Sequence, residues 1–235
     1  CVFCATARMG LVRNLDAGEI VGQVLQLKRT HPTRRQANLV FMGMGEPLDN
    51  FEELAQALSI LSDPEGMDIG ARHITVSTSG VLDGIRRLAE LGKPYGLALS
   101  LTSASEEERR RLMPVAGSTP LEELLEASAD YGRRYRRKVT LECAIIAGQN
   151  DDEDSARRLL SLARRGPFKV NLIPLNPIDG FAGERPSRPA LDRFAEILWE
   201  AGVVCTVRDS VGRDVTAACG QLVQRRRRDD STADH

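Results

Sequence analysis

The amino-acid sequence predicts an α/β fold built around a parallel sheet. Short apolar, β-branched segments alternate along the chain with longer amphipathic segments of helical spacing. Successive apolar segments start about 24 to 42 residues apart, which is the length of a strand, a crossover helix and two loops. With 235 residues, 42% of them hydrophobic, the chain has the size of one such domain. These observations leave a doubly wound sheet or a complete or partial barrel, and periodicity does not choose between them.

The predicted elements alternate regularly. Helices are predicted at about 16–29, 51–62, 80–92, 119–133, 152–165 and 188–201. Strands are predicted at 38–43, 72–77, 96–101, 139–146, 170–173 and 203–207. Asn50, Ser118 and Asp151 precede three of the helices as typical capping residues. The strands are near-continuously apolar, which is expected when helices cover both faces of a sheet.

Composition excludes several classes of protein. Lys and Arg number 32 against 33 Asp and Glu, so the net charge of −1 gives no general attraction to nucleic acid. No apolar run reaches the roughly 18 residues of a membrane span. An odd count of 5 Cys and no secretory leader favour a reducing, cytoplasmic location over a disulfide scaffold. We expect one domain over residues 1–222, followed by a charged, disordered tail over 223–235.

Polar and small residues follow the predicted strands at their carboxyl ends. These segments are 43–47, 77–80, 100–102 and 175–177. In parallel α/β folds, ligands bind at the edge of the sheet where the strands end. The sequence therefore predicts a single ligand site made from these four segments.

Several motifs have both a functional and a structural interpretation. Cys1 and Cys4 form a C-x-x-C pair that could share a metal, act as a redox pair or be accidental. The segment from Gly43 to Leu48 could admit a ligand to the backbone, with Glu46 accepting from an ammonium group, or could be a tight turn. Cys219, between Ala218 and Gly220, could be a small buried residue or a thiol in a cleft. The arginine runs at 109–111, 133–138 and 225–228 could meet phosphates, although solvated helix faces are the simpler interpretation.

Together these motifs resemble those of one family. In chain order they are Cys-x-x-Cys-Ala-Thr-Ala at 1–7, Met-Gly-Met-Gly-Glu-Pro at 42–47, Ser-Thr-Ser-Gly at 77–80, Asn-Leu-Ile-Pro-x-Asn-Pro at 171–177 and Ala-Ala-Cys-Gly-Gln at 217–221. This order resembles the radical S-adenosylmethionine (SAM) methyltransferases of the RlmN/Cfr type. The similarity runs from Cys1 to about Leu222.

The resemblance implies a partial (β/α) barrel of the radical SAM type whose first strand is missing from this chain. It implies a [4Fe-4S] cluster for which Cys1 and Cys4 are the second and third cysteine ligands. The first cluster cysteine, a further cysteine that resolves the protein–RNA adduct and an RNA-binding region are expected upstream, so we take the chain to be a fragment. The implied SAM contacts are Gly45, Glu46, Ser77, Ser100, Leu101, Thr102 and Asn176.

The implied activity is transfer of a methyl group from SAM, through a methylated Cys219, to C2 of an adenine in 23S ribosomal RNA, with tRNA as a second candidate substrate. Adenine C2 is electron-poor and cannot attack the methyl group of SAM, so a radical is needed. The implied partners are ribosomal RNA and a reductant protein such as flavodoxin or ferredoxin. We expect a monomer that contacts no membrane.

One departure from the family keeps two alternatives open. Where the family usually has Ser-Leu-His, this chain has Ser100, Leu101 and Thr102. A hydroxyl group can bond a ribose or a carboxylate, but it lacks the reach of imidazole. The alternatives are a related radical SAM enzyme with another substrate, and an inactive RNA-binding or structural paralogue.

Overall fold

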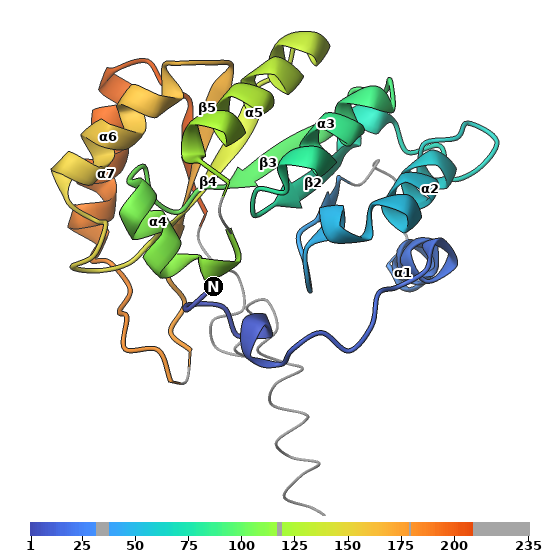
Figure 1. Ribbon diagram of the computed structural model, residues 1–235, viewed down its shortest axis with the longest axis horizontal. Coiled ribbons are helices and arrows are strands. Elements are labelled where there is room, and N and C mark those ends of the chain that lie inside the picture. The colour runs from blue at the N-terminus through green and yellow to red at the C-terminus, as the bar shows by residue number, and fades with distance from the viewer. Residues whose placement is uncertain (32–37, 117–118, 179, 209–235) are drawn as a thin grey trace, which may run out of the picture.

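The computed structural model describes residues 1–31, 38–116, 119–178 and 180–208. Six parallel strands form one sheet in chain order: β1 (Leu39–Phe41), β2 (Ile74–Thr78), β3 (Gly96–Ser100), β4 (Val139–Ile145), β5 (Phe168–Pro174) and β6 (Cys205–Val207). All six correspond to predicted strands, with ends shifted by a few residues. Figure 1 shows the helices arranged around the outside of this sheet.

The strand order distinguishes between the two predicted architectures. A doubly wound sheet reverses its order at a switch point, whereas the order here runs from β1 to β6 without reversal. The first and last strands also approach each other, since the Arg208 guanidinium Nη1 lies 3.4 Å from the Met42 sulfur. Arg208 follows β6 and Met42 follows β1. The sheet is therefore curved into a partial barrel, which confirms the predicted fold class.

The described part of the chain contains seven α-helices. They are α1 (Ala17–Thr30), α2 (Phe51–Leu61), α3 (Leu82–Glu90), α4 (Glu106–Leu112), α5 (Leu121–Tyr135), α6 (Glu153–Ala163) and α7 (Arg188–Glu200). Short 3-10 turns occur at η1 (Thr6–Arg8), η2 (Pro47–Asn50), η3 (Ala71–His73) and η4 (Pro114–Ala116). All except α4 were predicted from apolar spacing. None of the described helices has the length and apolar character needed to cross a membrane.

The main core lies between the sheet and the helices around it. In β4, Val139, Leu141 and Cys143 are at most 1% exposed and pack in this core. Successive side chains of a strand point to opposite faces, so Thr140 and Glu142 point to the other side of the sheet, the inside of the barrel. The expectation that helices cover both faces is therefore wrong. The described helices lie around the outside of the sheet (Figure 1), and Thr140 and Glu142 place polar groups on its inner side.

Asn150 ties the ends of β3 and β4 together. Its side-chain amide donates to the carbonyl oxygens of Thr102 at 3.0 Å and Ala144 at 2.8 Å, and its Oδ1 accepts from the Ile146 amide at 2.8 Å. Asn150 is 2% exposed, so these backbone groups have little access to water. Because buried backbone groups need partners, Asn150 fixes the loop after β3 against the end of β4.

We predict that Asn150→Ala lowers the free energy of unfolding by about 2–4 kcal/mol, because it leaves three backbone groups without partners in a buried setting. Chemical denaturation of the wild type and the variant measures this difference. The neighbouring Gln149→Ala is the matched control. The Gln149 side chain accepts from the exposed Arg111 guanidinium, so the change should alter stability by less than about 0.5 kcal/mol. Equal losses for both variants would contradict the role of Asn150.

Candidate functional site

The amino-terminal loop lies beside the ends of β4 and β5. The Val2 amide donates to the Leu112 carbonyl at 3.0 Å, and the Cys4 amide donates to the Cys1 carbonyl at 3.2 Å. Cys1 and Phe3 pack against a small buried cluster separate from the main core. This cluster consists of Leu112, Met113, Ala116, Ile146 and Leu175. Because Ile146 and Leu175 directly follow β4 and β5, the loop is held at the carboxyl edge of the sheet.

The described cysteines differ in accessibility. Cys1 and Cys4 are free and partly exposed, whereas Cys143 and Cys205 are buried in the core. Burial raises the pKa of the Cys205 thiol to about 12 and raises that of Cys143 further still. A thiolate is the form that binds metal, so Cys1 and Cys4 are the described cysteines suited to act as ligands.

The loop after β1 is built around the Glu46 carboxylate. Its Oε2 accepts from the Ser79 amide at 2.7 Å and from the Ser79 hydroxyl at 2.9 Å. Its Oε1 accepts from the Leu48 amide at 3.1 Å and caps η2. The structural interpretation of this motif as a turn is therefore correct. An ionised carboxylate offers about four acceptor positions, so Glu46 keeps one for a ligand.

Two glycines are required by this part of the site. Gly45 is exposed and has a φ of +108°, a backbone conformation that other residues rarely adopt. Gly80 has a φ of +119°, and a Cβ atom there would lie 2.8 Å from the Leu124 Cδ1 atom and 3.0 Å from the Arg109 Nη2 atom. Gly80 therefore lets α4 and α5 approach the end of β2. These constraints account for Gly45 of the 42–47 motif and for Gly80 of the 77–80 motif.

Ser77 lies on β2 and is 5% exposed. Its hydroxyl donates to the Glu142 carboxylate oxygen Oε2 at 3.2 Å. Glu142 lies on β4 and is 8% exposed. Burial raises its pKa, and the opposing influences are the Ser77 hydrogen bond, the Arg208 charge, the Asn171 hydrogen bond and the Lys169 charge. Glu142 was not among the residues predicted from the sequence, because a single acidic residue in an apolar strand does not show which face of the sheet it occupies.

The end of β3 and the segment after it contain three predicted site residues. The amides of Leu101 and Thr102 donate to the Glu142 carbonyl at 2.8 and 3.1 Å. Thr102 is buried and has a φ of +61°, the left-handed region that non-glycine residues rarely occupy. Ser100, the last residue of β3, is half-buried. The left-handed turn at Thr102 is thus held by the Glu142 carbonyl and by Asn150.

Asn176 follows β5 and is half-buried. Its Oδ1 accepts from the Arg185 Nη1 atom at 3.4 Å. The preceding Leu175 amide donates to the Ile145 carbonyl at 2.9 Å, which continues the pairing of β5 with β4 beyond the strand. Asn176 therefore lies at the same edge of the sheet as the other predicted residues.

Arg109 differs from its sequence-based interpretation. Arg110 and Arg111 are exposed, as expected for a solvated helix face, but Arg109 is 1% exposed. Its Nη2 donates to the Ser79 carbonyl at 2.7 Å, while Nε and Nη1 have no partner among the described residues. Burial lowers its pKa, and the Glu106 charge opposes this. Arg109 thus joins α4 to the Ser79 segment that Glu46 also binds.

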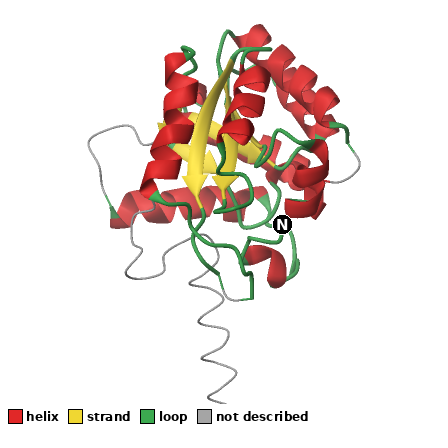
Figure 2. Cartoon of the chain, turned by 90° about the vertical axis from the view of Figure 1, so that its left-hand side faces the viewer, coloured by secondary structure: helices red, strands yellow, loops and turns green. Residues whose placement is uncertain are grey.

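The structure brings all the described predicted residues to the carboxyl edge of the sheet. Gly45 and Glu46 follow β1, and Ser77 is the penultimate residue of β2. Ser100 ends β3, and Leu101 and Thr102 follow it. Asn176 follows β5, and the loop of Cys1 and Cys4 lies beside the ends of β4 and β5. Cys219 and the predicted tail over 223–235 lie outside the described residues. Figure 2 shows the amino terminus near the tips of the strand arrows.

The cysteines present fit part of an iron–sulfur site. Cys1 and Cys4 are accessible thiols on one loop, the donors that such clusters use. Over the described ranges, no group of three or more His, Cys, Asp or Glu could hold a metal. The described residues therefore supply two ligands of the expected type.

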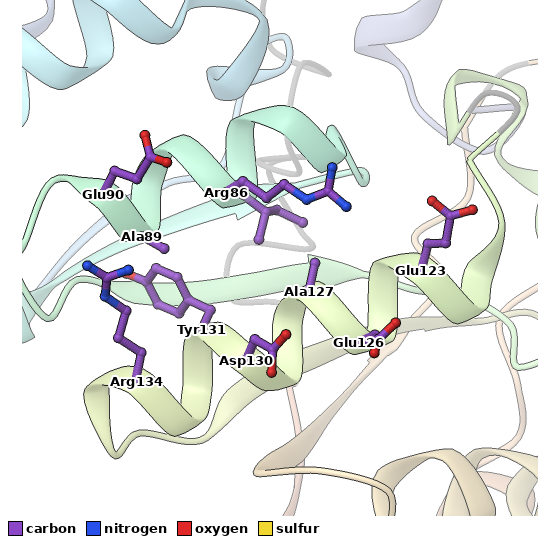
Figure 3. Close-up of a pocket in the computed structure, with 10 residues that line it drawn as sticks. Arg86, Ala89, Glu90, Glu123, Glu126, Ala127, Asp130, Tyr131 and Arg134 are labelled. Carbon is purple, nitrogen blue, oxygen red and sulfur yellow. The ribbon is translucent and has the colours of Figure 1, made fainter.

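A separate groove lies between α3 and α5, on the outer side of the barrel. It has a volume of about 360 Å³ and is lined by side chains of both helices, including Glu90, Glu126, Asp130 and Arg134 (Figure 3). None of the predicted site residues that the structure describes lines it. The groove is therefore distinct from the site at the strand ends.

Comparison with known proteins identifies the family. The pattern of the radical SAM superfamily matches residues 1–160. The chain belongs to this superfamily. It is 47% identical to the probable dual-specificity RNA methyltransferase RlmN of Symbiobacterium thermophilum, a match that covers 97% of this chain and 62% of the relative. It is also 47% identical to the dual-specificity RNA methyltransferase RlmN of Sorangium cellulosum, over 95% of this chain and 58% of the relative.

A solved structure agrees with this assignment. The crystal structure of a radical SAM methyltransferase from Sphaerobacter thermophilus aligns with a TM-score of 0.89 and 44% identity. The alignment covers 94% of this chain and 65% of that chain. The present chain thus spans about three fifths of the length of these relatives, and its fold is the partial barrel of radical SAM proteins.

We predict that Glu46→Gln lowers the free energy of unfolding by about 1–3 kcal/mol. The Gln side chain has one acceptor oxygen, and its amide would face the N–H groups of Ser79 or Leu48 that the carboxylate now accepts. Chemical denaturation measures the loss. Glu107→Gln, an exposed change on α4, is the control and should have little effect. A stability for Glu46→Gln equal to that of the control would show that this network contributes little.

Proposed function

We propose that this chain is the catalytic part of a radical SAM RNA methyltransferase. The proposed substrate is C2 of an adenine in 23S ribosomal RNA, with tRNA as a second substrate. A reductant protein such as flavodoxin or ferredoxin would supply electrons, and we propose that the protein acts as a monomer in the cytoplasm. Membership of the radical SAM superfamily and the similarity to RlmN relatives support this proposal.

The observation that carries the proposal is the meeting of two groups of residues at one edge of the sheet. The first is the loop with the accessible thiols of Cys1 and Cys4. The second is the set of polar strand ends that includes Glu46, Ser77 and Thr102. A site that holds an iron–sulfur cluster and also binds the polar groups of SAM needs both the thiols and the polar strand ends.

Each of these residues would have a distinct role in binding the cluster or SAM. Cys1 and Cys4 would hold the [4Fe-4S] cluster, while Glu46, with its remaining acceptor position, suits the ammonium group of SAM. Gly45 would let SAM approach the backbone. With SAM bound, the cluster supplies the radical chemistry that the electron-poor C2 of adenine requires. We propose Cys219 as the thiol that carries the methyl group between SAM and the base.

RNA binding would use single-stranded or flipped-out adenine, since C2 is inaccessible within a stack. Arg208 lies at the interior of the barrel mouth and is exposed, which suits contact with an RNA phosphate or base. The alternative of a related enzyme with another substrate is motivated by Thr102. Its hydroxyl occupies the position of a His in the RlmN/Cfr pattern.

We predict that the full-length protein, purified anaerobically after co-expression with cluster-assembly machinery, carries a methyl group on the tryptic peptide that contains Cys219. Mass spectrometry of the peptide measures this. Cys219→Ala is the matched variant and should lose RNA methylation while retaining iron. An unmodified Cys219 with SAM still cleaved reductively would favour the enzyme with another substrate. A protein with neither cluster nor cleavage would favour the inactive paralogue.

We also predict that Cys4→Ala in the full-length protein reduces bound iron to the background level, because a cluster ligand is lost. The melting temperature should change by only a few degrees, since the Cys4 side chain is partly exposed and contributes little packing. Cys205→Ala is the control, because this buried thiol lies in the core and should leave iron binding unchanged. Iron and sulfide analysis checks both variants, and full iron content in Cys4→Ala would contradict the proposal.

A further inference from the structure

Glu142 contacts three of the residues that the proposed SAM site uses, although it was not among the predicted site residues. Its side chain accepts from the Ser77 hydroxyl on β2. Its main-chain carbonyl accepts from the amides of Leu101 and Thr102 after β3. It lies on β4, next to Ser100 in the register of β3 with β4. One residue of β4 therefore links the ends of two other strands.

We propose that Glu142 is a positioning residue for SAM, which acts by fixing the Ser77 hydroxyl as a hydrogen-bond acceptor toward the bound cofactor. This inference rests on the proposed function, because it takes Ser77 to contact SAM. Glu142 itself need not touch the cofactor. Its side chain would affect SAM binding by holding the Ser77 hydroxyl. Its main-chain carbonyl would affect binding by holding the turn at Thr102.

The single proton of the Ser77 hydroxyl determines which hydrogen bonds this group can offer to a ligand. A serine hydroxyl can donate one hydrogen bond and accept two. In this structure the proton is directed to the Glu142 carboxylate, at an oxygen–oxygen distance of 3.2 Å. The lone pairs of Ser77 are then left for a ligand group that donates. SAM offers such donors in its ribose hydroxyls and its ammonium group, whereas its carboxylate offers none.

The surroundings of Glu142 support an acceptor role. The carboxyl group is buried, and the charged groups that act on it are Arg208, after β6, and Lys169, on β5. Asn171, its register partner on β5, also bonds it and accepts from the Thr206 hydroxyl at 2.9 Å. Burial, the largest influence, raises the pKa of Glu142, and these groups oppose that rise. The acceptor role therefore rests on the geometry, in which the Ser77 hydroxyl donates to the Glu142 Oε2 atom.

The test is a double-mutant cycle on ligand binding to the full-length, cluster-loaded protein. The probe is S-adenosylhomocysteine, which keeps the ribose hydroxyls and ammonium group of SAM but has no methyl group to transfer. Isothermal titration calorimetry gives its Kd for the wild type, Glu142→Gln, Ser77→Ala and the double variant. We expect each single variant to weaken binding about 3–10-fold, the value of one hydrogen bond. The double variant should be no weaker than the weaker single variant, because both act through one contact.

A control separates this effect from loss of any carboxylate near the strand ends. Glu108 also accepts from a serine hydroxyl, that of Ser103, in the segment after β3. Glu108→Gln should leave the Kd for S-adenosylhomocysteine within about twofold of the wild type, since Ser103 is not among the proposed SAM contacts. An equal loss of affinity in Glu108→Gln and Glu142→Gln would overturn the specific role of Glu142.

Stability provides a measurement that a purely structural role would not reproduce. The folded-state pKa of Glu142 is raised, so its stabilising contribution is present at low pH and is lost as the pH rises through that value. Glu142→Gln has no such ionisation. As the pH rises, the variant should therefore lose less stability than the wild type, while it still binds S-adenosylhomocysteine more weakly. Loss of affinity only in proportion to loss of stability would overturn the proposal.

The outcomes distinguish this inference from the proposed function. The inference would be overturned by additive losses of affinity in the double variant, or by an unchanged Kd in Glu142→Gln. Binding of the probe to the wild type would still support the SAM site in either case. A wild type that fails to bind the probe would overturn both the SAM site and the inference. A wild type that binds the probe but does not methylate RNA would contradict the proposed substrate and leave the role of Glu142 supported.

Discussion

The site depends on the parallel order of the strands. When neighbouring strands are parallel and follow one another along the chain, every strand ends at the same edge, and the segments after all of them meet there. The contact between Arg208 and Met42 shows that the edge is also curved, so that the ends of the first and last strands face each other. The strand order alone therefore brings residues that are far apart in the sequence to one edge of the sheet.

Buried hydrogen bonds then fix the loops that this order brings together. The carboxylate of Glu46 binds the segment after β2, the carbonyl of Glu142 binds the segment after β3, and Asn150 binds that segment to the end of β4. Leaving such groups unpaired in a buried setting is costly, so each loop has few alternative conformations. A cofactor that binds at the edge would meet a surface that is already ordered, which lowers the entropic cost of binding.

The sequence predicted the elements well where apolar spacing marked them, and less well where polar residues are buried. All six strands and six of the helices followed from periodicity. Helix α4 was missed because residues 106–111 are all charged and show no apolar face. Arg109 was expected on a solvated surface because its neighbours in the sequence are charged. Glu142 was missed because a single acidic residue in an apolar strand does not reveal which face it occupies. The motifs located Glu46 and Ser77, but the groups that bind their side chains, Ser79 and Glu142, come from distant parts of the chain.

The lengths of the outermost strands have a consequence for the behaviour of the chain in solution. A barrel that does not close leaves the backbone of its first and last strands free to pair with another molecule. Here those strands, Leu39–Phe41 and Cys205–Val207, have only three residues each, while the inner strands have five to seven. A template this short offers few hydrogen bonds to an incoming strand. Among the described strands, the short edges therefore limit the pairing of this sheet with a strand of another molecule.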